Sequence, residues 1–275
     1  MPSTAVQRST HRYAAAVART VQPDPDSSDG SKARRRNAST LRLYITRFSA
    51  RRCATSSRRC RNQPWTSQPT PTSPLKLGSL NIFSAVNKTG NIHDTINEFR
   101  LDLLALCETK THEDDPPDGF PALHVHRDLA AAHPTGGGLA VVYHDTLDVC
   151  AAQLPSLLTT YRTFEYQLIR VSSMRPAVTL ANVYRPPSTS VSLFYSEFSE
   201  FLSSVGSAFN NFVVCGDLNC PGPTSMSVAE DLAATFDAFG LSQHVCWPTR
   251  NDNVLDVLAT DDIITAGEVR VALKP

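Results

Sequence analysis

Short apolar runs separated by polar loops dominate the chain from residue 75 onward. They are rich in β-branched and aromatic residues, and glycine, proline or polar residues stand at their ends. This is the pattern of buried or half-buried strands. It predicts strands at 75–82, 101–107, 138–143, 164–171, 177–184, 211–215 and 254–260.

Apolar residues at helical spacing predict three helices among these strands. In 91–99 and in 190–205 the apolar residues fall on one face of a helix. The third helix follows Ser227, which we expect to form a capping box with Glu230, and Gly240 fits the position just after its end. Strands mixed with a few helices indicate an α/β or α+β domain whose sheets are covered by helices.

Charge divides the chain into a basic arm and an acidic body, although the formal net charge of the 275 residues is zero. Residues 1–75 contain 14 of the 26 Lys and Arg and 3 of the 26 Asp and Glu, a net charge of +11. The segment 1–74 is rich in Arg, Ser and Pro and poor in large apolar residues, so we expect it to be disordered. Its end, PTPTSP, is typical of an extended linker.

Three interpretations of this arm are open. The first is a nucleic-acid-binding tail, because Lys and Arg neutralise phosphates. The second is an organelle transit peptide, because the first 23 residues lack acids and contain three arginines. The third is a solvated leader without a function, which the composition favours.

Several classes of protein are not indicated by the sequence. No run approaches the roughly 20 apolar residues of a membrane span, and no secretory signal opens the chain. The seven cysteines include no C-x-x-C pair, so neither a zinc site nor a disulfide framework is indicated. We expect reduced thiols in a nuclear or cytoplasmic protein, and the oligomeric state is open.

Polar residues occur at the ends of several predicted strands, where an apolar run does not need them. Each one alone is more often a turn, cap or core residue than a catalytic group. Strand ends that converge on one edge would instead place two acids, two amides and a phenol around one pocket. Carboxylate and amide oxygens suit Mg²⁺, or Mn²⁺ in its place, and such a site cleaves phosphate esters. The residues are Asn81, Glu108, Tyr184, Asp217 and Asn219, with Asp256 in the last predicted strand.

The ordered motifs SLN, LCETK, NVYRPP, CGDLN and VLDVLAT resemble the endonuclease/exonuclease/phosphatase superfamily. Over about residues 75–275 the succession is similar to the apurinic-type endonuclease domain of LINE-like non-LTR retrotransposons. The resemblance implies a four-layered α/β sandwich, with two β-sheets flanked by helices. It also implies a Mg²⁺-dependent endonuclease that nicks target DNA, so DNA is the expected partner and a membrane is not.

The resemblance implies a role for each matching residue. Glu108 would ligate Mg²⁺ with help from Asn81, and Asp217 would activate the attacking water. Asn219 would bind the scissile phosphate and orient that water. Tyr184 would donate its hydroxyl to the phosphate as charge builds up in the transition state.

Two further residues match the family, and one of its motifs is absent from the sequence. Asp256 corresponds to the acid that holds the catalytic histidine, and Thr249 in WPTR would contact the DNA backbone. The family's final Ser-Asp-His does not occur, because the sequence ends with EVRVALKP. We therefore expect a domain truncated before its last strand, with an open sheet edge and little activity.

Two alternatives stay open beside this interpretation. One is a catalytically inactive retroelement relic or nucleic-acid-binding module, whose DNA affinity would depend on salt and on residues 1–74. The other is a superfamily phosphodiesterase that acts on another phosphoester, such as a phosphoinositide, a sphingolipid or a nucleotide.

Overall fold

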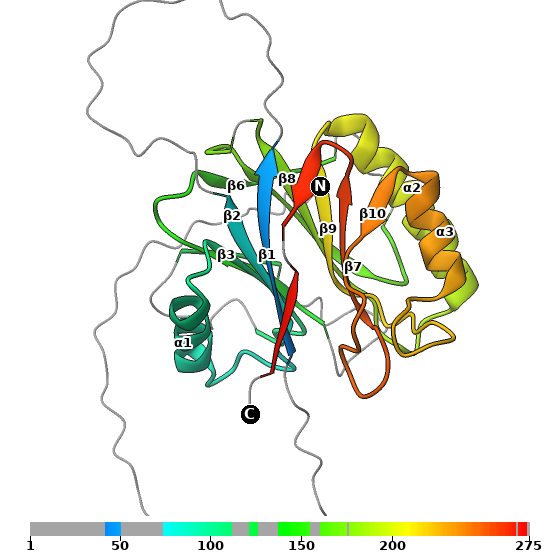
Figure 1. The fold of residues 1–275 in the computed structure, drawn as a ribbon, viewed down its shortest axis with the longest axis horizontal. Coiled ribbons are helices and arrows are strands. Elements are labelled where there is room, and N and C mark those ends of the chain that lie inside the picture. The colour runs from blue at the N-terminus through cyan, green and yellow to red at the C-terminus, as the bar shows by residue number, and fades with distance from the viewer. Residues whose placement is uncertain are drawn as a thin grey trace, which may run out of the picture.

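Two β-sheets pack face to face, and helices cover their outer faces (Figure 1). The computed structural model of the protein describes residues 42–50, 74–111, 121–125, 137–154, 160–174, 176–267 and 269–273. Within these residues the first sheet has seven strands and the second has six.

The first sheet is mixed. Its strands are β1 (Arg42–Ala50), β2 (Leu75–Asn81), β3 (Leu103–Cys107), β4 (Ala122–Val125), β5 (Leu139–Tyr143), β12 (Ile264–Ala266) and β13 (Arg270–Leu273). The strand order is β12, β1, β2, β3, β5, β4, and β13 also pairs with β1. Only β2 and β3 pair in parallel among these described strands.

The second sheet is also mixed. Its strands are β6 (Val149–Ala151), β7 (Glu165–Val171), β8 (Val178–Tyr184), β9 (Phe212–Asp217), β10 (Leu241–Gln243) and β11 (Asp256–Asp261). The strand order is β10, β11, β9, β8, β7, β6. β8 and β9 are parallel, and both are buried along their whole length.

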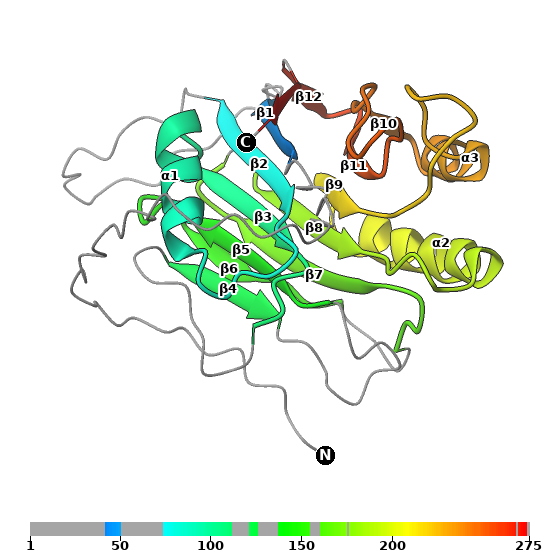
Figure 2. The ribbon, with the colours of Figure 1, turned by 90° about the horizontal axis from the view of Figure 1, so that it is seen from below.

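One helix covers the first sheet and two cover the second (Figures 1 and 2). α1 (Thr89–Phe99) buries Ile92 and Ile96 in an apolar cluster with Leu104 and Leu106 of β3. α2 (Val191–Ala208) and α3 (Glu230–Ala238) lie side by side on the other outer face. Their buried residues are Phe194, Phe198, Phe201, Leu202 and Val205 of α2 and Leu232 and Phe236 of α3.

The predicted elements are confirmed, with boundaries that shift by a few residues. The seven predicted strands correspond to β2, β3, β5, β7, β8, β9 and β11, and all three helices are present. The sequence pattern does not predict β4, β6, β10, β12 and β13, because strands of three or four residues carry too little periodicity. The α/β sandwich with flanking helices is the observed fold.

The strand β1 lies in the segment 1–74, which the composition predicts to be disordered. β1 pairs antiparallel with β2, from Tyr44 opposite Ser79 to Phe48 opposite Leu75, and Figure 1 shows it in blue beside β2. The other edge of β1 pairs with β12 and β13. β2 therefore has a paired strand on each side, because pairing with distant strands overrides local composition. The rest of 1–73 lies outside the described residues.

The predicted capping box at α3 is wrong. The helix begins at Glu230 with Ala229 as its N-cap and no side-chain cap. Ser227 instead hydrogen-bonds Thr224, with 2.9 Å between their hydroxyl oxygens, and so closes a turn before the helix. Gly240 follows the helix end with a φ of +65°, as predicted, and its N–H donates to the carbonyl of Asp237.

The described part of the chain contains five cysteines. Cys107, Cys150, Cys215, Cys220 and Cys246 are free thiols, and Cys246 alone among these five is exposed. No helix in the described ranges is long and apolar enough to cross a membrane.

Gly216 allows β9 to run beside β8 up to the acid that ends it. Its φ of +129° is a conformation that L side chains rarely adopt, and an added Cβ would collide with the backbone of Val183 on β8. Without a side chain, the parallel pairing continues to Tyr184 opposite Asp217. The glycine therefore positions Asp217.

We expect Gly216→Ala to lower the free energy of unfolding by about 2–5 kcal/mol, because backbone strain and overpacking act together. Gly90→Ala in α1 is the matched control, since no atom lies within 4 Å of its added Cβ. This control should raise the free energy of unfolding by at most about 1 kcal/mol. Urea unfolding measures both variants, and equal midpoints would contradict the constraint.

Candidate active site

The candidate residues lie where four strands end. Asn81 ends β2, and Glu108 directly follows its parallel neighbour β3. Tyr184 and Asp217 pair at the ends of the parallel strands β8 and β9, and Asp256 of β11 pairs with Asp217 from the other side. The same ends of the two sheets therefore supply all five residues.

The Asn81 side chain connects the two sheets at this end. Its amide nitrogen donates to Glu108 Oε1 at 2.7 Å and to Asp217 Oδ2 at 2.8 Å. Its amide oxygen accepts the backbone N–H of Phe83 at 3.0 Å. All three polar residues are buried, with exposed fractions of 7% for Asn81, 8% for Glu108 and 0% for Asp217. One amide thus satisfies two carboxylates that have little access to water.

Glu108 reaches this position through a strained backbone. Its φ is +53°, which is uncommon for a residue other than glycine. The backbone N–H groups of Thr109 and Lys110 donate to the carbonyls of Gly138 and Gly137, each at 3.1 Å. These hydrogen bonds to the neighbouring loop hold the conformation, and strain of this kind is typical of functional sites.

Asp217 is a buried acid surrounded by three donors. Asn81 is the first donor. The second is the backbone N–H of Asn219, which donates to Oδ1 at 3.1 Å, and the third is Arg250, whose Nη2 lies 3.2 Å from Oδ2. The pKa of Asp217 is raised to about 6, because burial and, to a lesser extent, Glu108 outweigh the lowering by Arg250, Asn81 and Asn219. No histidine in the described part of the chain is among the hydrogen-bond donors of Asp217.

Tyr184 and Asn219 complete the site. Burial raises the pKa of Tyr184, and the adjacent Glu108 carboxylate, which accepts its hydrogen bond, raises it too. Tyr184 therefore stays a neutral phenol that can donate a proton in a hydrogen bond. Asn219 has a φ of +50°, and its amide nitrogen donates to the carbonyl of Arg185 at 2.7 Å.

Comparison with known proteins assigns the sequence to a family. The sequence pattern of the Endonuclease/Exonuclease/phosphatase family matches residues 78–228, more than half of the chain. The chain belongs to this family. No curated protein matches the sequence.

Solved structures share the family fold at low sequence identity. The endonuclease domain of TRAS1, a telomere-specific non-LTR retrotransposon, aligns with a TM-score of 0.52 at 15% identity over 69% of this chain and 86% of that one. The 3′ phosphatase NExo from Neisseria, bound to product DNA hairpin, aligns at 0.51 and 16% over 68% and 87%. The AP endonuclease LMAP from Leishmania major aligns at 0.50 and 13% over 69% and 79%. These likenesses establish the fold.

Arg185 holds the loop that carries Asn219 in this Endonuclease/Exonuclease/phosphatase site. Sequence reasoning did not predict this role. Its exposed fraction is 1%, and it has no ion pair among the described residues. Its guanidinium donates to the carbonyls of Asn219 at 3.0 Å, Leu218 at 3.3 Å and Thr189 at 2.8 Å, and lies over the Phe194 ring. The signal was its place directly after Tyr184, where the buried strand β8 ends.

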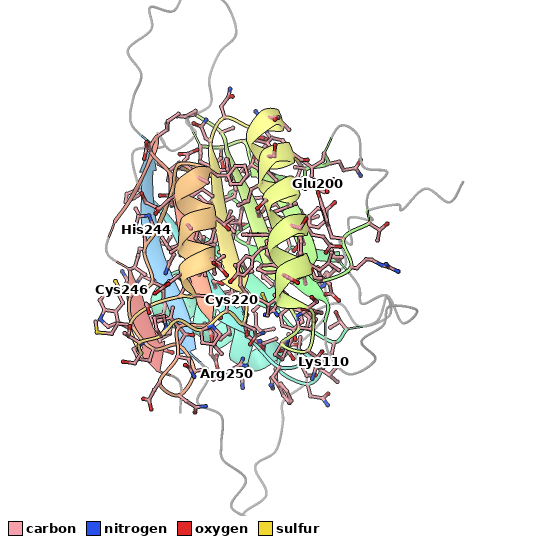
Figure 3. All side chains as sticks on the ribbon, turned by 90° about the vertical axis from the view of Figure 1, so that its right-hand side faces the viewer. Lys110, Glu200, Cys220, His244, Cys246 and Arg250 are labelled. Carbon is pink, nitrogen blue, oxygen red and sulfur yellow. The ribbon has the colours of Figure 1, made fainter. Side chains whose placement is uncertain are left out.

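Arg250 is the second residue that sequence reasoning missed. It lies on the loop before β11, where its backbone pairs with Asn253 in an isolated bridge. Its side chain is 44% exposed, although it contacts the fully buried carboxylate of Asp217. Figure 3 shows Arg250 and Lys110 at the same edge of the molecule. A contact between a loop arginine and a strand acid 33 residues away has no local sequence signal.

Asp256 pairs with Asp217, and Thr249 hydrogen-bonds the backbone of Asp256. The buried Thr249 hydroxyl accepts the backbone N–H of Leu255 at 2.8 Å and of Asp256 at 3.2 Å, which fixes the start of β11. The predicted contact of Thr249 with the DNA backbone stays a prediction. Asp256 is buried beside Asp217, and its proposed partnership with a histidine stays a prediction.

The donor set fits a hard divalent cation held by few protein ligands. Glu108 and Asp217 offer carboxylate oxygens, which Mg²⁺ prefers. Asn81 turns its nitrogen toward them, so in this arrangement it orients the carboxylates. The described residues contain no group of three His, Cys, Asp or Glu that could hold an ion. Mg²⁺ does not need one, since it binds through one or two carboxylates plus water and substrate phosphate.

We expect Arg185→Met to lower the free energy of unfolding by about 2–4 kcal/mol, because buried carbonyls of the 218–220 loop lose their donor. Arg170→Met on β7 is the matched control, since Arg170 is exposed. This control should change the free energy by no more than about 0.5 kcal/mol. Urea unfolding compares the two, and similar losses would show that Arg185 does not hold the loop.

Proposed function

We propose that this protein is a Mg²⁺-dependent DNA endonuclease of the non-LTR retrotransposon type, which hydrolyses a phosphodiester bond and nicks its target. The observation that carries the proposal is the single amide of Asn81 that joins Glu108 and Asp217 across two sheets. A hydrogen-bond-donating phenol, Tyr184, lies beside the same carboxylates. The family membership and the fold shared with a retrotransposon endonuclease support it.

The metal would be held at Glu108. This carboxylate accepts a hydrogen bond from Asn81 through Oε1 at 2.7 Å, and its Oε2 lies 3.8 Å from Lys110 Nζ. When bound, Mg²⁺ supplies charge stabilisation to the phosphate oxygens. Mn²⁺ satisfies the same oxygen donors.

The protein residues would divide the hydrolytic step among them. The water oxygen bonds to phosphorus, its proton passes to Asp217, and the bond from phosphorus to the 3′-oxygen breaks. The released 3′-oxygen takes a proton from solvent and becomes the 3′-hydroxyl. Tyr184 donates to the phosphate oxygens as their charge grows, and Asn219 orients the water.

The cations near the site would bind the DNA backbone. The body of the protein is acidic, so it repels DNA except where lysine and arginine are placed. Arg250 and Lys110 flank the carboxylates at one edge of the molecule. The basic arm 1–74 would add sequence-independent affinity that weakens with salt. We expect slow nicking, because the sequence does not contain the family's final Ser-Asp-His motif.

The test is nicking of supercoiled plasmid by the full 275-residue protein with Mg²⁺. We expect slow conversion to the open circle, complete loss with EDTA or in Asp217→Ala, and about 100-fold slower nicking in Tyr184→Phe, which removes one preorganised donor. Tyr166→Phe is the matched control, because Tyr166 of β7 packs against Phe201 of the covering helix α2 and not against the candidate site. It should nick at the unaltered rate.

Two outcomes would contradict the proposal. Nicking that persists in Asp217→Ala would point to a contaminating nuclease or another site. A well-folded protein that binds DNA without nicking it under Mg²⁺ or Mn²⁺ would favour the nucleic-acid-binding alternative.

A further inference from the structure

An exposed aromatic ring lies two residues beyond Asn81. Phe83 has an exposed fraction of 63%, the highest among the large apolar residues of the described part of the chain. The other exposed apolar side chains are mostly aliphatic, and isolated ones are normal on protein surfaces. Phe83 adjoins the candidate active site, since its backbone N–H donates to Asn81.

The backbone of Phe83 holds the ring outward in a strained conformation. Its φ is +56°, a genuine outlier for a bulky residue. Its N–H donates to Asn81 Oδ1 at 3.0 Å, and the carbonyl of Ile82 before it accepts from Lys88 Nζ at 2.7 Å. Two residues later, Ala85 N–H donates to the carbonyl of Thr109 at 2.7 Å. The ring is therefore fixed to the site rather than carried by a loose loop.

Positive charge surrounds this ring. Lys110 Nζ lies 3.7 Å from the ring centroid, a cation–π contact, and 3.8 Å from Glu108 Oε2. Lys88 is close enough to Lys110 that the second charge lowers the pKa of Lys88, in addition to the effect of burial. An exposed ring with one lysine over it and a second lysine bonded to the preceding carbonyl suits a ligand with a flat face and a nearby negative charge.

We propose that the Phe83 ring is a stacking platform for a nucleobase adjacent to the phosphate held at the active site, with Lys110 and Lys88 binding the neighbouring backbone. The proposal rests on the nuclease function and deepens it. A single sugar separates the base of a nucleotide from its phosphate. A single residue separates Phe83 from Asn81, so the ring lies close to the site that would hold the phosphate. The ring stacks on any base, because every base has a π face.

The inference specifies the substrate. A base can stack on Phe83 only when it has left the DNA helix, and unstacking is easiest at unpaired or mismatched bases and at flexible steps. The preferred substrate is therefore DNA that is distorted or unpaired beside the cleaved phosphate. Base identity has little influence, since no base-reading contact is involved.

The test uses duplex oligonucleotides that carry one 2-aminopurine, either paired or placed opposite a gap, with the full chain in EDTA. Binding is measured by anisotropy, and stacking by quenching of 2-aminopurine fluorescence. We expect quenching of the unpaired probe by the wild type and by Phe83→Trp. Phe83→Leu, which keeps an apolar side chain without a π face, should lose the quenching and bind about 5- to 100-fold more weakly.

Ile263→Ala is the control, because Ile263 is also exposed but follows β11 at the end away from Asp256. It should quench and bind as the wild type does. Quenching and affinity that are equal in wild type and Phe83→Leu overturn the stacking platform, whether or not the protein nicks plasmid. Phe83-dependent quenching without plasmid nicking supports the platform and contradicts the nuclease function alone.

Discussion

The candidate site depends on one amide nitrogen that two carboxylates share. Asn81 belongs to the first sheet and Asp217 to the second, so their hydrogen bond at 2.8 Å fixes how the strand ends meet. Without this donor, two buried acids would face each other, and each would favour its protonated form. Bringing like charges together also favours a cation between them. The contact that joins the two sheets therefore lies at the proposed metal site.

Backbone strain gathers at the loops that follow the strands, while the sheets stay regular. Phe83, Glu108, Lys110 and Asn219 all have a φ near +50°, and each lies within three residues of a strand end. Every such conformation costs free energy and persists because the packed strands below over-determine it. Rigid strands thus position loop residues for chemistry, and the ladder hydrogen bonds supply the stability that the loops lack.

Two arginines act at different depths of the site. Arg185 is buried and holds the carbonyls of the 218–220 loop, so it determines where Asn219 lies. Arg250 is half exposed and contacts Asp217 from the solvent side. The body of the protein carries a net negative charge. Within it, Arg185 maintains the loop, and Arg250 is exposed at the position where we propose that the substrate binds.

The sequence alone determined the fold class, the central strands, the three helices and the polar residues at the strand ends, because long periodic runs and polar interruptions are local signals. Only tertiary structure decided that 42–50 is a strand, that Ser227 closes a turn, and that Arg185 and Arg250 support the site. Each depends on a partner distant in sequence or on competition between nearby hydrogen bonds. Such contacts are settled by the packing of the whole chain, and no window of residues contains them.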